Sequence, residues 1–169
     1  MTNISASQVK ELREKTGLGL MDCKKALEEA NGDLELAIEE LRKTSGVKAS
    51  KKSGRSAADG LIGILSKNSN IFMIEVNCET DFVARDQSFI EFTSNTLNDY
   101  SERPDSSLEE LLQNGVEENR EKLVQKLGEN IVVRRIDKTS GSSVAGSYLH
   151  SNKKIGCIVS LEGGDISLA

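Results

Sequence analysis

The sequence predicts an α+β fold in which a bundle of three short helices precedes a larger domain of helices packed on a mostly antiparallel sheet. Two observations lead to this prediction. Apolar residues recur at helical spacing in three segments before residue 43, and after residue 59 several β-rich apolar runs enclose two helical stretches. We therefore expect a three-helix domain over 1–43, a basic linker over 44–58 and an α+β domain over 59–169.

The composition excludes several classes of protein. Hydrophobic residues make up 37% of the chain and charged residues 29%, which is typical of a helix-rich soluble domain, and the net charge of -5 argues against direct binding to nucleic acid. The three scattered cysteines fit free thiols in a reducing compartment. Neither a signal peptide nor an apolar run of about 20 residues is present, so we expect a cytoplasmic protein that does not bind membranes.

The first three helices have clear start and stop signals. Ser5 and Gln8 form a capping-box pattern, Gly17 can end the first helix, and Asp33 can cap the third. The second and third helices repeat the i, i+3, i+4, i+7 spacing of a buried face in Cys23, Ala26, Leu27 and Ala30 and in Leu34, Ala37, Ile38 and Leu41. The sequence therefore predicts a compact bundle of three amphipathic helices.

The loop between the first two helices is apolar. The bundle resembles the ubiquitin-associated type of three-helix domain, in which this loop and the last helix present an apolar patch to a partner. Here the candidate patch is Leu18, Leu20 and Met21. The alternative is that these side chains fill the bundle's own core.

A basic tract follows the bundle. Residues 42–58 contain six basic residues and no acidic one. Contact with RNA or phosphate is one interpretation, but no aromatic residue is interleaved to stack on a base. A solvated linker, or a helix extension that ends in a linker, is the favoured interpretation.

The α+β domain begins with strands expected at 59–65 and 70–78. A helix capped at Asp86 should follow, and a second helical stretch should open at Ser106 or Ser107 and stop at Gly128. Three further strands are expected at 130–138, 144–150 and 154–161.

The segment between the second strand and the first helix of this domain is unusual. The polar residues Thr80 and Asp81 are followed by Phe82, a large aromatic residue with no periodic partner. In one interpretation Thr80 or Asp81 caps a short helical turn, and Phe82 and Val83 fold back onto the core. In the other, the carboxylate and the aromatic ring form a binding tip at the end of a rigid strand.

Catalytic and metal-binding patterns are absent from the sequence. It contains no phosphate-binding glycine loop, nucleophile elbow or metalloprotease motif, and its one histidine, His150, has no neighbouring nucleophile or acid. The cysteines lack metal-ligand spacing. We therefore expect a binding protein that is not an enzyme and uses neither a cofactor nor a metal.

Several segments in order along the chain resemble the translation elongation factor Ts family. They are 9–17, 21–27, 30–33, 57–60, 75–84, 128–131 and 146–150. The resemblance implies a guanine nucleotide exchange factor that binds elongation factor Tu and speeds GDP release during protein synthesis.

The resemblance also implies which residues bind the GTPase. The tip, Thr80 to Val83, would approach the Mg²⁺ and phosphate region, with Asp81 and Phe82 as the intruding pair. The three-helix domain would contribute Arg13, Leu20, Met21 and Lys24, and His150 would lie on the partner-facing side of the α+β domain. Members of the family often have methionine where this chain has Leu20, which keeps the contact apolar.

The resemblance also implies how much of the family's usual chain is present. The common form of the family continues into a second core subdomain beyond the equivalent of Ala169, so we expect a fragment or a short form with reduced affinity as a monomer. Short forms can pair through their sheets, which implies a homodimer through the core sheet as a second arrangement. The alternative function is an adaptor that uses the three-helix domain to bind a ubiquitin-like or ribosome-associated partner. That alternative leaves Asp81, Phe82 and the α+β domain unexplained.

Overall fold

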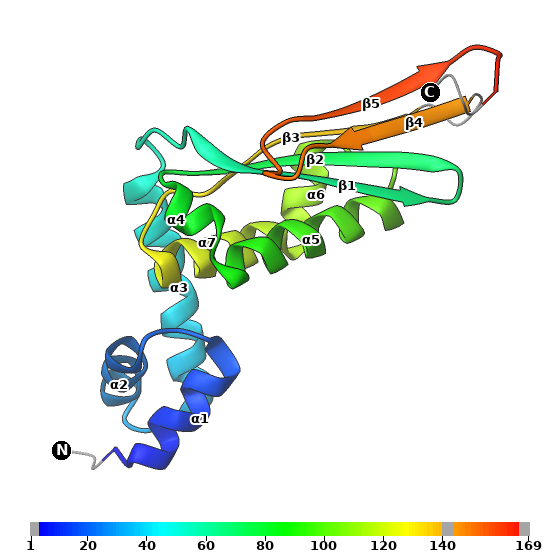
Figure 1. Cartoon of the computed structure of the whole chain (residues 1–169). Coiled ribbons are helices and arrows are strands. Elements are labelled where there is room, and N and C mark those ends of the chain that lie inside the picture. The colour runs from blue at the N-terminus through cyan, green and yellow to red at the C-terminus, as the bar shows by residue number, and fades with distance from the viewer. Residues whose placement is uncertain (1–3, 140–143, 166–169) are drawn as a thin grey trace. The chain divides into compact units, whose positions relative to one another are not determined.

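The computed structural model describes residues 4–139 and 144–165 (Figure 1). The chain divides into two compact units. The first comprises Met1–Gly54 and Glu118–Asn130, and the second comprises Arg55–Glu117 and Ile131–Ala169. Helices and antiparallel sheets are both present, which confirms the predicted α+β class. None of the described helices is both long enough and apolar enough to cross a membrane.

The first unit begins with the predicted helical bundle. Its helices are α1 (Ala6–Thr16), α2 (Leu20–Glu29) and α3 (Leu34–Lys52). Ser5 and Gln8 form the expected capping box, Gly17 ends α1 in the left-handed conformation, and Asp33 caps α3. The buried side chains of the bundle are Val9, Leu12, Leu18, Cys23, Ala26, Leu27, Ala30, Ala37 and Leu41.

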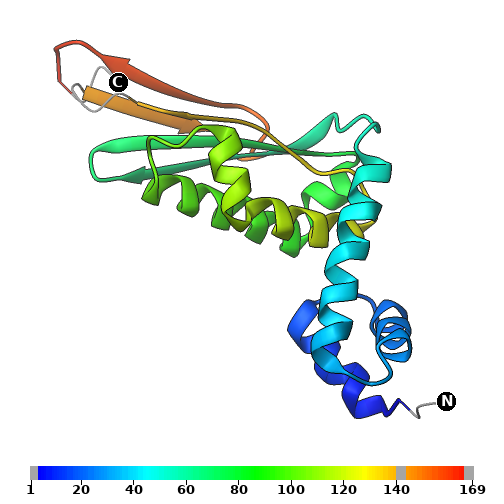
Figure 2. The ribbon, with the colours of Figure 1, turned by 180° about the vertical axis from the view of Figure 1, so that it is seen from behind.

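Helix α3 extends into the basic tract. Of the two interpretations of this tract, the helix extension that ends in a linker is confirmed, because residues 44–52 continue α3 as one uninterrupted helix, and a linker that begins at residue 44 is wrong (Figure 2). The reason is burial of the small residues Ser45 and Ala49, each 1% exposed. Small residues carry a weak hydrophobic signal, which explains why the periodicity did not reveal the helix.

The extension of α3 belongs to the same unit as most of α7 (Glu117–Leu127). Ser45 donates a hydrogen bond to Gln125, and the Lys52 ammonium donates to the Gly128 carbonyl at 2.6 Å. The first unit is therefore larger than the bundle over 1–43, because a distant helix of the chain joins it.

The second unit contains a three-stranded antiparallel sheet in the order β1-β2-β3. Its strands are β1 (Asp59–Lys67), β2 (Asn70–Cys78) and β3 (Val132–Lys138). Helices α4 (Asp81–Ala84) and α5 (Gln87–Glu102) pack on one face, and the hairpin of β4 (Val144–Leu149) and β5 (Gly156–Leu161) lies against the other (Figure 1). The core between the sheet and α5 includes Phe72, Ile74, Val76, Phe89 and Leu97.

The second helical stretch of this unit is interrupted. Ser107 and Glu110 form a capping box that opens α6 (Leu108–Leu111), which confirms one of the two predicted starts. The stretch then passes through a wider turn, η1 (Leu112–Val116), in which Asn114 and Gly115 leave the helical conformation. Gly115 has φ +91°, a value that favours glycine, so the chain bends before α7 begins.

Candidate functional site

The predicted tip follows directly from the central strand of the sheet. β2 pairs with β1 on one side and β3 on the other, and its residues Ile74 and Val76 are almost completely buried. At its end, the Cys78 thiol donates to the Thr80 carbonyl oxygen at 3.2 Å. The tip is therefore attached to a buried strand that is hydrogen-bonded on both sides.

Thr80 begins a single helical turn, α4. Its hydroxyl oxygen accepts a hydrogen bond from the Val83 backbone N–H at 3.4 Å, as an N-cap does. Val83 and Ala84 are buried, at 9% and 3% exposure. The interpretation of Thr80 as a cap, with Val83 folded onto the core, is thus confirmed.

Phe82 behaves differently from Val83. Its side chain is 81% exposed, the highest value among the exposed large hydrophobic residues of the described chain. Successive residues of a helix differ by about 100° in direction, so a turn that buries 83 and 84 can turn 82 outward. The expectation that Phe82 would fold back onto the core is therefore wrong, and the aromatic ring is available to a partner.

Asp81 lies beside Phe82 and carries the charge of the tip. Its carboxylate accepts from the Arg85 guanidinium at 2.5 Å, across one helical turn. The next residue, Asp86, caps α5 by accepting from the Ser88 backbone N–H at 2.8 Å, as predicted. The tip is thus a capped turn between a central strand and a long helix, with an exposed aromatic ring and, beside it, a carboxylate paired with Arg85.

The predicted apolar patch of the first unit separates into buried and exposed residues. Leu18 is 3% exposed and belongs to the bundle core, so its assignment to the patch is corrected. Leu20 and Met21, at 53% and 70% exposure, open α2 and face solvent. The loop therefore places one apolar side chain in the core and presents two to a partner.

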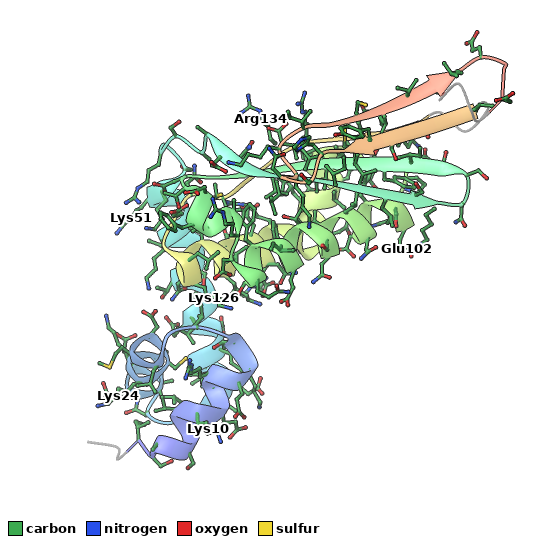
Figure 3. The ribbon with its side chains drawn as sticks, viewed as in Figure 1. Lys10, Lys24, Lys51, Glu102, Lys126 and Arg134 are labelled. Carbon is green, nitrogen blue, oxygen red and sulfur yellow. The ribbon has the colours of Figure 1, made fainter. Side chains whose placement is uncertain are left out.

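The charged residues predicted near this patch are also accessible. Lys24 projects from α2, and its Nζ lies 3.7 Å from Glu28 Oε1 (Figure 3). Arg13 is exposed on the last turn of α1. Beside Met21, Asp22 forms an ion pair of 3.0 Å with Lys48. All of these residues belong to the first unit, whereas the tip belongs to the second.

His150 follows β4 and is partly buried. Its Nδ1 accepts from the Asn152 backbone N–H at 3.3 Å, and its ring lies edge-on to Tyr148 at 6.4 Å. The turn that His150 opens reaches the tip, because Asp81 and Ser151 line the same cavity. The structure thus brings His150's turn and the tip together within one unit.

The structure also reveals charged residues near the tip that the sequence analysis did not select. They are Arg85, which pairs with Asp81, and Lys153 and Lys154 in the turn after His150. The i, i+4 spacing of Asp81 and Arg85 was a usable signal for the first. Nothing in the sequence indicated that two lysines about 70 positions later would lie beside them.

Potential metal ligands and the thiols were located among residues 4–139 and 144–165. Within these ranges no three His, Cys, Asp or Glu side chains are close enough to hold a metal ion. Cys23, Cys78 and Cys157 are free thiols, as predicted, and the first two are buried.

Comparison with known proteins gives consistent matches. A family model described as Elongation factor TS matches residues 79–169, a range that includes Thr80, Asp81, Phe82 and Val83. The chain is 53% identical to the Elongation factor Ts of Marinobacter nauticus and 51% identical to that of Hahella chejuensis, in each case over all of this chain and 59% of the relative. It is 47% identical to the Elongation factor Ts of Arthrospira platensis, over 99% of this chain and 71% of that protein. The chain thus spans about three fifths of the first two relatives.

Proposed function

The chain belongs to the elongation factor Ts family, and on this premise we propose that it is a guanine nucleotide exchange factor that binds elongation factor Tu and promotes GDP release during translation elongation. In this proposal it acts in the cytoplasm, without a cofactor and without covalent chemistry of its own. The observation that carries the proposal is the 81% exposure of Phe82 on a rigid, capped turn.

The exposure of Phe82 supports a role in binding. A fully exposed aromatic ring gains little for folding, and burying it against a partner is worth roughly 1.5 to 3 kcal/mol. The cap at Thr80 and the burial of Val83 fix the backbone that carries the ring before binding, which lowers the entropy cost of association. The tip is therefore built as a preorganised binding element.

We propose that Asp81 and Phe82 act by entering the Mg²⁺ and phosphate region of the GTPase. If the factor and GDP oppose each other, each weakens the binding of the other by the same factor, because the coupling free energy is reciprocal. A ten-thousandfold faster release of GDP requires the activation free energy of release to fall by about 5.5 kcal/mol. Burial of Phe82 covers at most about half of this, so the displaced Mg²⁺ ligation and other contacts must supply the rest.

The remaining contacts are proposed to come from Arg13, Leu20, Met21 and Lys24 in the first unit and from His150 in the second. Leu20 and Met21 support this assignment because both are exposed while the neighbouring Leu18 is buried. Two exposed apolar side chains at the start of a helix suit an apolar surface on the partner.

Release of fluorescent GDP from elongation factor Tu tests the proposal. We expect the protein at micromolar concentration to accelerate release at least tenfold over the spontaneous rate. Binding without acceleration would contradict the exchange function. Absence of binding to elongation factor Tu would instead favour the adaptor alternative based on the three-helix domain.

A further inference from the structure

A cavity of about 330 Å³ lies directly behind the tip. Its lining comes from the beginning of β1, from α4 and α5, and from the turn that joins β4 to β5. Leu61 and Ala84 are buried and supply an apolar part of the wall. Asp81 lines the cavity as well, so a group that enters it would contact the tip at the same time.

Cationic residues dominate the polar lining of the cavity. Arg85, Lys153 and Lys154 carry three positive charges against the single negative charge of Asp81. Arg85 pairs with Asp81, and Lys154 pairs with Asp59 at 2.8 Å. No ion pair to Lys153 is found within the part of the chain that the structure describes, which leaves one positive charge in excess.

The backbone of Lys153 is held firmly in this position. Its carbonyl oxygen accepts from the Ile62 N–H of β1 at 2.7 Å, and its own N–H donates to the His150 carbonyl at 2.8 Å. The Lys153 residue has φ +56°, a left-handed conformation that a lysine rarely adopts. The turn is further closed by the hydrogen bond from His150 N–H to the Ile155 carbonyl. A long side chain therefore starts from a fixed point at the edge of the sheet.

We infer that this cavity binds a carboxylate side chain of the GTPase partner, with Lys153 and Arg85 as the binding residues. The Arg85 guanidinium has five N–H donors, and its single ion pair leaves donors for a second carboxylate. The Lys153 ammonium supplies the excess positive charge. Charge-assisted hydrogen bonds of this kind are the stronger ones in proteins, so one acidic residue matches the charge of the cavity and the donors that line it.

This inference rests on the proposed function and extends its contact surface beyond the tip. The carboxylate site shares Asp81 with the tip, so Phe82 and the cavity would be occupied in one binding event. An exposed positive charge at an interface acts mainly on the association rate and on its salt dependence. Phe82 thus contributes affinity, and Lys153 and Arg85 select the partner electrostatically.

The test begins with charge reversal at Lys153. We expect Lys153→Glu to weaken binding to elongation factor Tu about tenfold and to reduce the salt dependence of the association rate. Lys67→Glu is the control for charge reversal elsewhere in the second unit, because Lys67 ends β1 six residues and roughly 20 Å from the cavity residue Leu61; it also breaks the ion pair with Glu102, so its stability is measured beside its affinity. Equal affinities of Lys153→Glu and the wild type would overturn the inference while leaving the exchange function intact.

A carbodiimide cross-link identifies the chemistry of the bound group. The reagent joins a lysine amine to a carboxylate in contact with it, so mass spectrometry of the complex should find Lys153 linked to an Asp or Glu of the GTPase. Lys153→Arg should bind normally and lose the link. A bound complex with Lys153 unlinked would contradict the inference. A loss of affinity in Lys153→Glu confined to GDP-bound partner would also contradict it, and would assign the site to nucleotide phosphate.

Discussion

At the scale of single residues, the tip separates folding from binding. Val83 is buried and Phe82 is exposed, although the two are neighbours in the same helical turn. The stability of the fold therefore depends on Val83, and in the proposed function binding to the partner depends on Phe82.

This separation predicts that two alanine substitutions differ in their effect on the free energy of unfolding. Phe82→Ala should leave the free energy of unfolding within about 0.5 kcal/mol of wild type, because an exposed side chain contributes little to it. Val83→Ala should lower it by roughly 1 to 2 kcal/mol, since the change leaves a cavity in the core. Urea unfolding gives both values. A destabilised Phe82→Ala variant would contradict the exposed position of the ring.

Thr80 provides a second prediction at this scale. Thr80→Ala removes the hydroxyl that caps α4 and should cost about 1 kcal/mol of local stability, with slower GDP release as the tip loses its fixed geometry. Thr80→Ser keeps the hydroxyl and should restore most of the activity. Equal activity of both variants would show that the cap does not position Phe82.

At the scale of elements, the pairing of β1 with β2 supports both the tip and the cavity. Gly60 has φ +150°, and a Cβ atom there would lie 2.1 Å from the Val76 carbonyl oxygen. The two strands approach closely at this point, where Gly60 pairs with Asn77, the last residue but one of β2. Only glycine fits this approach without a shift of the backbone.

We therefore expect Gly60→Ala to destabilise the second unit by roughly 2 to 4 kcal/mol. Gly54→Ala is the control, because a Cβ atom at Gly54 meets no atom within 4 Å. Urea unfolding monitored by circular dichroism distinguishes the two. A Gly60→Ala protein as stable as Gly54→Ala would contradict the close approach of the strands.

The ion pair between Asp59 and Lys154 attaches the turn after β4 to β1 and predicts a pH dependence. The Lys154 ammonium, and then the Gly60 N–H, hold the pKa of Asp59 below its ordinary value of 3.8. A folded-state pKa below the unfolded value stabilises the fold above about pH 3.8, and this contribution is lost as the pH falls through the folded pKa.

The stability difference between wild type and Asp59→Asn should accordingly be larger at pH 7 than at pH 3. Asp105→Asn is the control, because the Asp105 side chain is 94% exposed despite its ion pair with Lys138. A difference in the free energy of unfolding between wild type and Asp59→Asn that is the same at both pH values would contradict the stabilising role of this ion pair.

The elements themselves were largely predictable from the sequence. Ser5, Asp33, Asp86 and Ser107 are caps in the structure, as their hydrogen-bonding chemistry predicts, and the five strands lie within a few residues of their expected positions. The extension of α3 was predicted only as one of two alternatives, because its buried residues Ser45 and Ala49 are small and their burial depends on contact with a distant helix. The cavity was not predictable for a similar reason. The residues that line the cavity come from four separate elements, and no local sequence pattern indicates that Arg85 and Lys153 line the same cavity.

At the scale of the whole molecule, the two units carry separate predicted contacts. Leu20 and Met21 lie in the first unit and Phe82 in the second. Because the two sets of residues belong to different units, the losses of affinity from Leu20→Ala/Met21→Ala and from Phe82→Ala should add to within about 0.5 kcal/mol in the combined variant. Leu36→Ala, also an exposed leucine of the first unit, is the control. A combined loss no larger than either single loss would contradict independent contacts.

The most direct test of the central claim compares exchange with binding in Asp81→Ala/Phe82→Ala. The rate of fluorescent GDP release from elongation factor Tu is measured with this variant and with the wild type, at concentrations that saturate binding. We expect the variant still to bind nucleotide-free elongation factor Tu but to lose most of the acceleration, because the tip is the part of the protein that weakens the binding of GDP. A variant that binds and accelerates release as well as the wild type would contradict the tip as the agent of exchange.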